Sequence, residues 1–223
     1  MNVSAAIDTR MSCRAFLSTP VPRDTVIDIL ERAKRAPSGG NLQPWLVHVL
    51  TGAALADFLA IIRQKMQTTP AGEGSEYPIY PANLHEPYRS RRYTLGEDLY
   101  ATIGIGREDK VGRLRQFARN YEFFGAPVGL FFSIDRRMGT DQWADVGMFM
   151  QNIMLLAREH GLHTCPQEAW AIWHKTIAEF LRLPPEVMLF SGMALGFRDE
   201  AAPINQLRSS RAALEDFATL SGF

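Results

Sequence analysis

Two short, strongly apolar runs constrain the fold of this 223-residue chain more than any other feature. VGLFFSI at residues 128–134 and VMLFSGMALGF at residues 187–197 have the composition of buried strands, and both are far shorter than the ~20 residues that span a bilayer. LVHVLT at residues 46–51 predicts a third strand. The spacing of apolar residues predicts helices at residues 26–33, 55–66, 111–121, 141–162 and 171–181. We therefore expect an α+β or α/β fold, with one sheet flanked by helices, in a single domain over residues 1–223.

Local signals predict where several of these elements begin and end. Asp24 or Thr25 is expected to cap the first helix, and Pro37 to end its pattern. HTCPQEAW at residues 163–170 is expected to be a loop. The helix at 141–162 is apolar on most sides, which places it in a core or a subunit interface.

Residues 69–110 form a long insertion interrupted by four prolines. Ordered loops of this length are usually lids or binding surfaces, so we expect a lid-like wall that selects the substrate. Its YRSRRY stretch points to Tyr88 and Arg91 as substrate-binding residues, and GEDLYATIG at residues 96–104 is a candidate helix. The alternative is a partly disordered surface insertion.

Charge and cysteine content limit the expected binding partners and the expected cell compartment. Lysine plus arginine and aspartate plus glutamate both total 24, so no net charge favours nucleic acid or an anionic membrane as partner. The two cysteines form no Cys-x-x-Cys pair, which predicts a reducing compartment. The start MNVSAAIDTR has no basic and then apolar signal pattern, so we expect a cytoplasmic protein.

Common catalytic motifs are absent. There is no P-loop, no G-x-S-x-G elbow and no H-E-x-x-H, and GIGRED at residues 104–109 lacks the third glycine of a dinucleotide fingerprint. His160 and His163 flank a helix end, where a solvated position is the simpler interpretation, and no metal site is expected. If the chain is an enzyme, a cofactor carries the chemistry.

Four stretches are candidates for binding that cofactor. In RMSCRAF, Arg10, Ser12 and Arg14 alternate, and two guanidinium groups with a hydroxyl suit a phosphate. PSGGNLQPW at residues 37–45 combines glycines, which let backbone approach a ligand, with polar side chains. CPQEAWA at residues 165–171 offers amides, and the tail offers Arg208 and Arg211. Taken singly, each also fits a plain role: solvated arginines, a turn, a helix junction and a charged chain end.

The order of these stretches resembles the FMN-dependent nitroreductase family over nearly the full chain. Arg-x-Ser-x-Arg near the start, Pro-Ser-Gly-Gly-Asn-x-Gln-Pro-Trp one helix later, Pro-Gln-Glu-Ala-Trp after the long apolar helix and a late arginine follow that family's order. NLHEPYRSRRY and CPQEAWA resemble the subgroup that reduces nitrobenzoates and dinitroaniline-type compounds.

The resemblance implies a flavoenzyme that moves hydride from NADH or NADPH through FMN to an electron-poor acceptor, most often a nitroaromatic, by a ping-pong mechanism in an interlocked homodimer. The phosphate and ribityl chain would lie at the first motif and the tail, the isoalloxazine at the third motif, and the second motif would come from the other subunit. The implied cofactor-binding residues are Arg10, Met11, Ser12, Arg14, Pro37, Ser38, Gly39, Gly40, Asn41, Gln43, Pro166, Gln167, Glu168, Ala169, Arg208 and Arg211.

The sequence departs from the family pattern in two places. Ala169 stands where some members have glycine, and the two tail arginines are three residues apart rather than two. A further family position falls near Arg119 or Asn120. On the same scaffold, a reductive dehalogenase or an enone reductase is the first alternative, and a flavin-binding or flavin-processing module without NAD(P)H turnover is the second.

Overall fold

The computed structural model describes all residues, 1–223, and its centre is a four-stranded sheet in the order β1-β2-β4-β3. The strands are β1 (Leu46–Thr51), β2 (Val128–Asp135), β3 (His163–Gln167) and β4 (Val187–Gly196). Every neighbouring pair is antiparallel. The α+β expectation is therefore confirmed, and the α/β alternative, with its parallel strands, does not apply.

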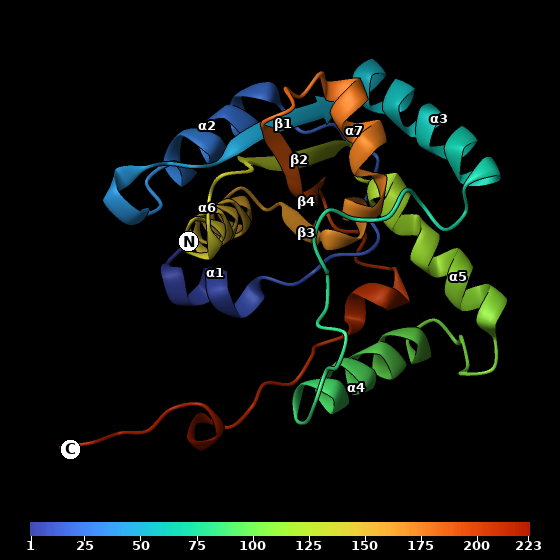
Figure 1. The fold of residues 1–223 in the computed structure, drawn as a ribbon. Coiled ribbons are helices and arrows are strands. Elements are labelled where there is room, and N and C mark those ends of the chain that lie inside the picture. The colour runs from blue at the N-terminus through green and yellow to red at the C-terminus, as the bar shows by residue number, and fades with distance from the viewer.

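Helices lie on both faces of this sheet (Figure 1). They are α1 (Val3–Thr9), α2 (Arg23–Ala33), α3 (Gly52–Thr68), α4 (Tyr88–Ala101), α5 (Lys110–Ala118), α6 (Thr140–Glu159) and α7 (His174–Leu181). Short 3-10 turns are η1 (Gly39–Asn41), η2 (Arg119–Gly125), η3 (Glu168–Trp173), η4 (Pro203–Gln206) and η5 (Leu214–Asp216). No helix has the length and apolar character needed to cross a lipid bilayer.

Strand β2 separates two hydrophobic cores because its side chains alternate between the faces of the sheet. Leu130 and Phe132 pack with α2 and α6, where Phe149 is buried. Phe131 points to the other face and packs with Phe58 of α3 and with η3. The apolar run that predicted a buried strand is thus buried from both sides.

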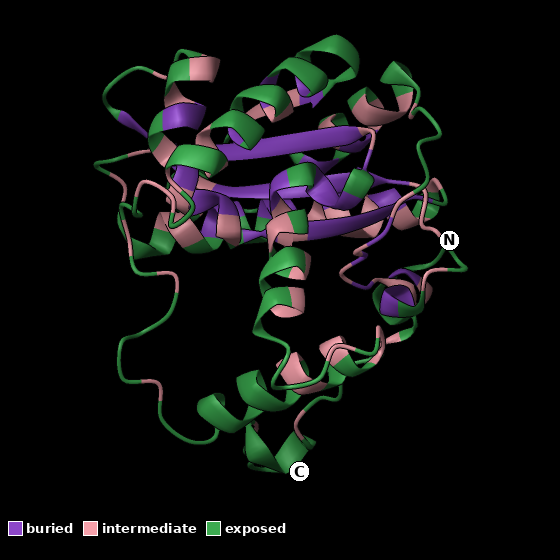
Figure 2. Cartoon of the chain, turned by 90° about the vertical axis from the view of Figure 1, so that its right-hand side faces the viewer, coloured by how far each residue is buried: buried purple, intermediate pink, exposed green.

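Two parts of the chain extend away from this body (Figure 1). One is α4 and the segments around it; the other is the C-terminal segment 207–223. Figure 2 shows that both are mainly exposed, whereas β2, β3 and β4 are mainly buried. Phe217 and Leu220 of the C-terminal segment are 71% and 66% exposed, so their apolar surface is uncovered in a single chain.

Several expected boundaries were wrong. Residues 163–167 form strand β3 rather than a loop, because an edge strand tolerates Pro166, whose missing N–H is not needed on the outer side. The helix expected from residue 171 begins at His174, after η3, and the helix expected to residue 121 ends at Ala118. Pro22, not Asp24 or Thr25, is the N-cap of α2. Helix α1 was not expected, and α4 extends well N-terminal to the candidate helix at 96–104.

Candidate functional site

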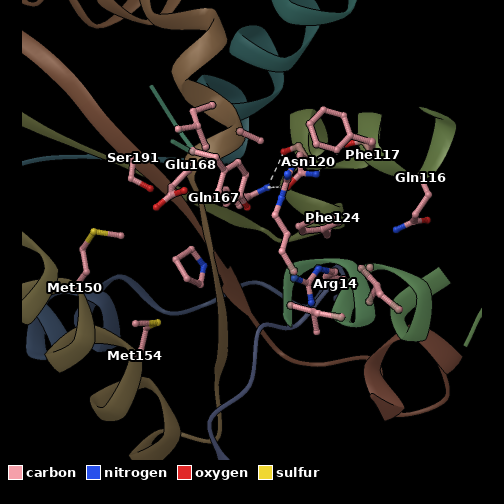
Figure 3. A pocket seen from close by; sticks show the side chains of 18 of the residues that line it. Arg14, Gln116, Phe117, Asn120, Phe124, Met150, Met154, Gln167, Glu168 and Ser191 are labelled. Carbon is pink, nitrogen blue, oxygen red and sulfur yellow. Dashed lines mark hydrogen bonds between the residues drawn. The ribbon is translucent and has the colours of Figure 1, made fainter. Parts of the chain in front are cut away.

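A cavity of about 690 Å³ lies beside the sheet, between α6, the β3–η3 junction and the insertion. Its lining joins residues that are far apart in sequence (Figure 3). Met150 and Met154 of α6 lie on one side and Asn120 and Phe117 on the other. The insertion contributes Ile79, Tyr80, Arg92, Leu95, Gly96, Leu99 and Tyr100. Most of the wall is apolar, which suits a flat organic ligand.

The third motif lies on this wall. Pro166, Gln167, Glu168 and Ala169 all line the cavity, and β3 pairs with β4 up to the Gln167–Gly192 position. Gly192 is required there, because a Cβ would lie 2.3 Å from Cδ1 of Trp170. The indole of Trp170 therefore packs directly on the sheet and sets where η3 turns away from it.

The side chain of Gln167 is held within the protein rather than offered to a ligand. Its Nε2 donates to the Asn120 carbonyl oxygen at 2.8 Å, and its Oε1 accepts from Nε1 of Trp170 at 3.3 Å. Glu168, by contrast, has no hydrogen bond or ion pair and faces the cavity, and partial burial raises its pKa.

The first motif runs along β3. Ser12 forms a bridge with Thr164, and the Cys13 N–H donates to the Thr164 carbonyl at 2.9 Å. The Arg14 side chain reaches the cavity, and its Nη1 donates to the Ser12 carbonyl at 3.2 Å. Its backbone N–H donates to Oδ1 of the buried Asn205, which ties the tail to this motif at 2.8 Å.

The other arginines of the first motif and the tail converge nearby. Burial and the Arg211 guanidinium both lower the pKa of Arg10, so these two cations lie close together. Arg208 lies near His163, whose pKa is lowered to about 4 by burial and by Arg158, Arg198 and Arg208. Neither Met11 nor Ser12 lines the cavity; Met11 is buried, with its sulfur 3.4 Å from Arg198 Nη1.

Arg158 and Arg198 were not identified from the sequence. Arg158 donates to the Leu162 carbonyl at 2.6 Å and to Thr9 Oγ1 at 3.2 Å, while Arg198 pairs with the exposed Glu200 at 3.0 Å. The signal for Arg158 is a basic residue directly after the apolar run MLLA in α6. Arginines from α6, the end of β4 and the tail thus gather with a single carboxylate, an arrangement that suits a phosphate.

The second motif lies away from the cavity. None of Pro37, Ser38, Gly39, Gly40, Asn41 and Gln43 lines it. The Gly39 N–H donates to Asp145 of α6 at 3.2 Å, and the Gln43 N–H donates to Ser38 Oγ at 3.0 Å. Gly40 has a φ of 58°, a conformation that glycine adopts readily. One chain therefore presents two of the three motifs at one site and the second motif elsewhere.

The structure also places the residues near the central strand and in the insertion. Asn120 lines the cavity, whereas Arg119 does not and instead contacts the Phe124 carbonyl at 3.5 Å. Tyr88 and Arg91 do not line the cavity in a single chain. The next arginine, Arg92, does, with its guanidinium carbon 4.0 Å from the ring centre of Tyr80.

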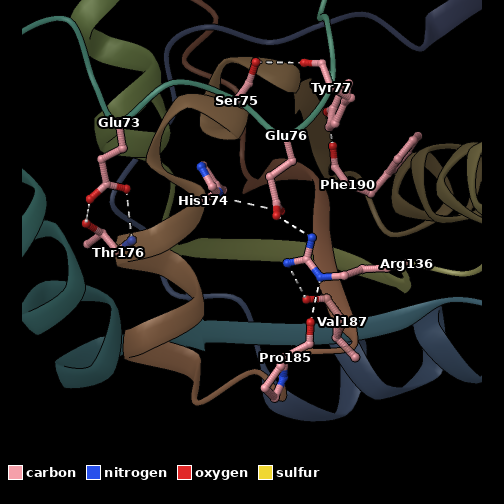
Figure 4. A network of polar contacts seen from close by, with 10 residues as sticks. All are labelled: Glu73, Ser75, Glu76, Tyr77, Arg136, His174, Thr176, Pro185, Val187 and Phe190. Atoms are coloured by element: carbon pink, nitrogen blue, oxygen red, sulfur yellow. Dashed lines mark hydrogen bonds and ion pairs between the residues drawn. The ribbon is translucent and has the colours of Figure 1, made fainter.

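The start of the insertion is anchored to the body (Figure 4). Glu73 accepts from the Thr176 N–H at 3.0 Å and from its hydroxyl at 2.6 Å. Glu76 lies between Arg136 and His174, whose Nδ1 is 3.5 Å away, and the Tyr77 hydroxyl donates to the Phe190 carbonyl. The cavity wall formed by residues 79–100 is therefore fixed at its beginning to α7, to β4 and to the residue after β2. Helix α7 packs against η3, and strand β4 packs against both η3 and β3, which carry the third motif.

Comparisons with known proteins agree with this arrangement. A model of the Nitroreductase family matches residues 7–197. A chloronitrobenzene nitroreductase of Comamonas testosteroni is 41% identical over 96% of this chain and 94% of its own. A 4-nitrobenzoate reductase of Pseudomonas putida is 39% identical over 98% and 95%.

Two solved structures are also similar. The FMN and NADPH-dependent nitroreductase NfnB from Sphigopyxis sp. strain HMH superimposes with a TM-score of 0.97 and 46% identity, over 100% of both chains. The FMN-dependent nitroreductase NfnB from Mycobacterium smegmatis, solved with NADPH, gives a TM-score of 0.93 and 27% identity over 98% of this chain and 97% of its own.

Proposed function

Because this chain belongs to the nitroreductase family, we propose that it is an FMN-dependent oxidoreductase that moves hydride from NADH or NADPH to a nitroaromatic acceptor. The observation that carries this proposal is the convergence of the first and third motifs on one cavity of about 690 Å³. The names of the relatives, which act on chloronitrobenzene and 4-nitrobenzoate, support a nitro compound as the acceptor. FMN, when bound, supplies the hydride chemistry; the protein supplies binding, orientation and electrostatics.

The arginines fit the phosphate of FMN. Arg10 and Arg211 repel each other, and an anion bound beside them would relieve this repulsion. Arg198 Nε is buried without a hydrogen-bond partner. We assign the phosphate to Arg10, Ser12, Arg14, Arg208 and Arg211, with Arg14 nearest the ring because its side chain lines the cavity.

The third motif fits the ring. Gln167 is fixed by Asn120 and Trp170, so the backbone that follows it, through Glu168 and Ala169, is held in place. Met150 and Met154 of α6 form another part of the wall and add apolar surface to it. These residues orient the acceptor and keep the site dry, and Glu168, the one carboxylate among the lining residues, is available to hold a proton.

We further propose an interlocked homodimer in which Pro37–Gln43 of one subunit completes the cavity of the other. The exposed surface of one chain is 12894 Å². A compact monomer of 25.1 kDa exposes about 10,300 Å². The excess of roughly 2,600 Å² per chain, or about 5,200 Å² for two chains, is at the upper end of the range of obligate homodimer interfaces. Helix α6 supports this interpretation, because the apolar side chain of Met148 remains 40% exposed in a single chain.

We also propose a cytoplasmic location, which the two buried free thiols, Cys13 and Cys165, support.

Purified protein tests the proposed function directly. We expect it to bind FMN, to lose its yellow colour when NADH or NADPH is added without oxygen, and to regain it when a nitroaromatic compound is added. The product should be the hydroxylamine, identified by mass spectrometry. A protein that binds FMN but is not bleached by either nicotinamide would instead be a flavin-binding module.

A further inference from the structure

The cavity contains a cation that the cofactor does not require. Its lining has two arginines, Arg14 and Arg92, and one carboxylate, Glu168. Arg14 belongs to the first motif, next to the cofactor phosphate. Arg92 comes from α4, on the insertion side of the cavity, within the YRSRRY stretch and outside the motifs that bind the cofactor.

The contacts of Arg92 differ from those of two other arginines, Arg89 of α4 and Arg113 of α5. Arg89 pairs with Glu86 at 2.7 Å, and Arg113 pairs with Glu97 at 2.7 Å. Arg92 has no carboxylate partner and instead lies 4.0 Å from the ring centre of Tyr80. The Tyr80 ring positions the guanidinium without using its N–H donors, so all five remain available to a ligand.

A guanidinium with free N–H groups matches a carboxylate, since both are planar and can form two parallel hydrogen bonds. The adjacent aromatic and apolar side chains, among them Tyr80 and Leu95, suit the ring to which such a carboxylate would be attached. Glu168 opposes an anionic ligand less than an ordinary glutamate would, because partial burial raises its pKa.

We propose that Arg92, held over Tyr80, is a specificity-determining residue that favours nitroaromatic acceptors carrying a carboxylate on the ring. This inference rests on the proposed function and deepens it, because it distinguishes anionic acceptors such as nitrobenzoates from neutral ones such as nitrobenzene.

The test compares 4-nitrobenzoate with 4-nitrobenzamide, which has nearly the same shape and no charge. We expect the wild type to prefer the benzoate, and Arg92→Met to lose about fivefold in kcat/KM for it, mainly through KM. The amide should be reduced equally well by both proteins, and FMN affinity should not change. Arg92→Lys should restore part of the preference, and salt should weaken it in the wild type.

Arg107→Met is the matched control. Arg107 also lies over a tyrosine of α4, with its guanidinium carbon 5.7 Å from the ring centre of Tyr93, but it does not line the cavity. This variant should keep the wild-type ratio of the two substrates.

An unchanged benzoate-to-amide ratio in Arg92→Met would overturn the proposal, and so would an equal loss for both substrates, which indicates a structural role. If the wild type reduces neither compound, the proposed function fails instead. Equilibrium dialysis of benzoate then still decides the role of Arg92: weaker binding to Arg92→Met than to wild type supports it, and equal binding overturns it.

Discussion

Gln167 and Asn120 come from segments 47 residues apart, and Nε2 of Gln167 donates to the Asn120 carbonyl oxygen at 2.8 Å. This bond joins the third motif to the turn that precedes the central strand β2. The side chain of Gln167 has a second partner, because its Oε1 accepts from Nε1 of Trp170. The two bonds together fix this part of the cavity wall.

Replacing Gln167 with methionine should therefore destabilise the protein. The substitution leaves the buried Nε1 of Trp170 without an acceptor and the Asn120 carbonyl without this donor, which costs about 1–3 kcal/mol. Urea unfolding measures the change. Gln116→Met is the control, because Gln116 lines the same cavity but makes no side-chain hydrogen bond, and it should unfold like the wild type.

Gly192→Ala should also destabilise the fold. The added Cβ would lie 2.3 Å from Trp170 Cδ1 on a fully buried indole, and overpacking of this kind costs about 1–3 kcal/mol. Gly96→Ala in α4 meets nothing within 4 Å and should be neutral or stabilising. Similar melting temperatures for the two variants would show that the sheet accommodates the methyl group.

Arg14→Ala should weaken FMN binding roughly ten- to a hundredfold, the loss expected for one charge-assisted partner of a buried anion. Riboflavin, which has no phosphate, should lose much less. Fluorescence titration gives both dissociation constants. Equal losses would mean that Arg14 contacts the ring or the ribityl chain and not the phosphate.

His163 should make stability depend on pH. Its pKa is lowered to about 4 in the folded chain, from an ordinary value of 6.5, because burial and nearby arginines disfavour the charged ring. The unfolded chain therefore binds more protons than the folded chain between pH 4 and pH 6.5. The contribution of His163 to the free energy of unfolding is fully present above about pH 6.5 and is lost as the pH falls toward 4. His163→Gln should show a smaller loss of unfolding free energy between pH 7 and pH 4.5. A parallel decline in both proteins would contradict this assignment.

The proposed dimer predicts complementation between two impaired variants. Arg14→Ala and Gln43→Ala, unfolded together and refolded, should recover activity if Arg14 and Gln43 of different subunits serve one flavin. A mixed dimer then has one site with both defects and one with neither, so random pairing restores about a quarter of all sites. If both residues serve the flavin of their own chain, every site keeps one defect and activity stays at the level of the parents.

Local patterns in the sequence determined much of this protein. The apolar runs that became β2 and β4 and the helical spacing of α2, α3 and α6 are properties of neighbouring residues, so they could be interpreted without knowing the fold. The order of the motifs similarly indicated the family. Strand β3 could not be recognised, because Pro166 argues against a strand unless it is known to lie at a sheet edge.

Only the tertiary structure decided which side chains share a site. In α4, adjacent residues point about 100° apart, and packing against the cavity selects Arg92 where the sequence alone favoured Arg91. Arg158, Arg198 and Arg208 meet near His163 although they come from distant segments. Asn120 likewise reaches Gln167 only because η2 folds against η3. Such contacts depend on how whole elements pack, and no local periodicity encodes that.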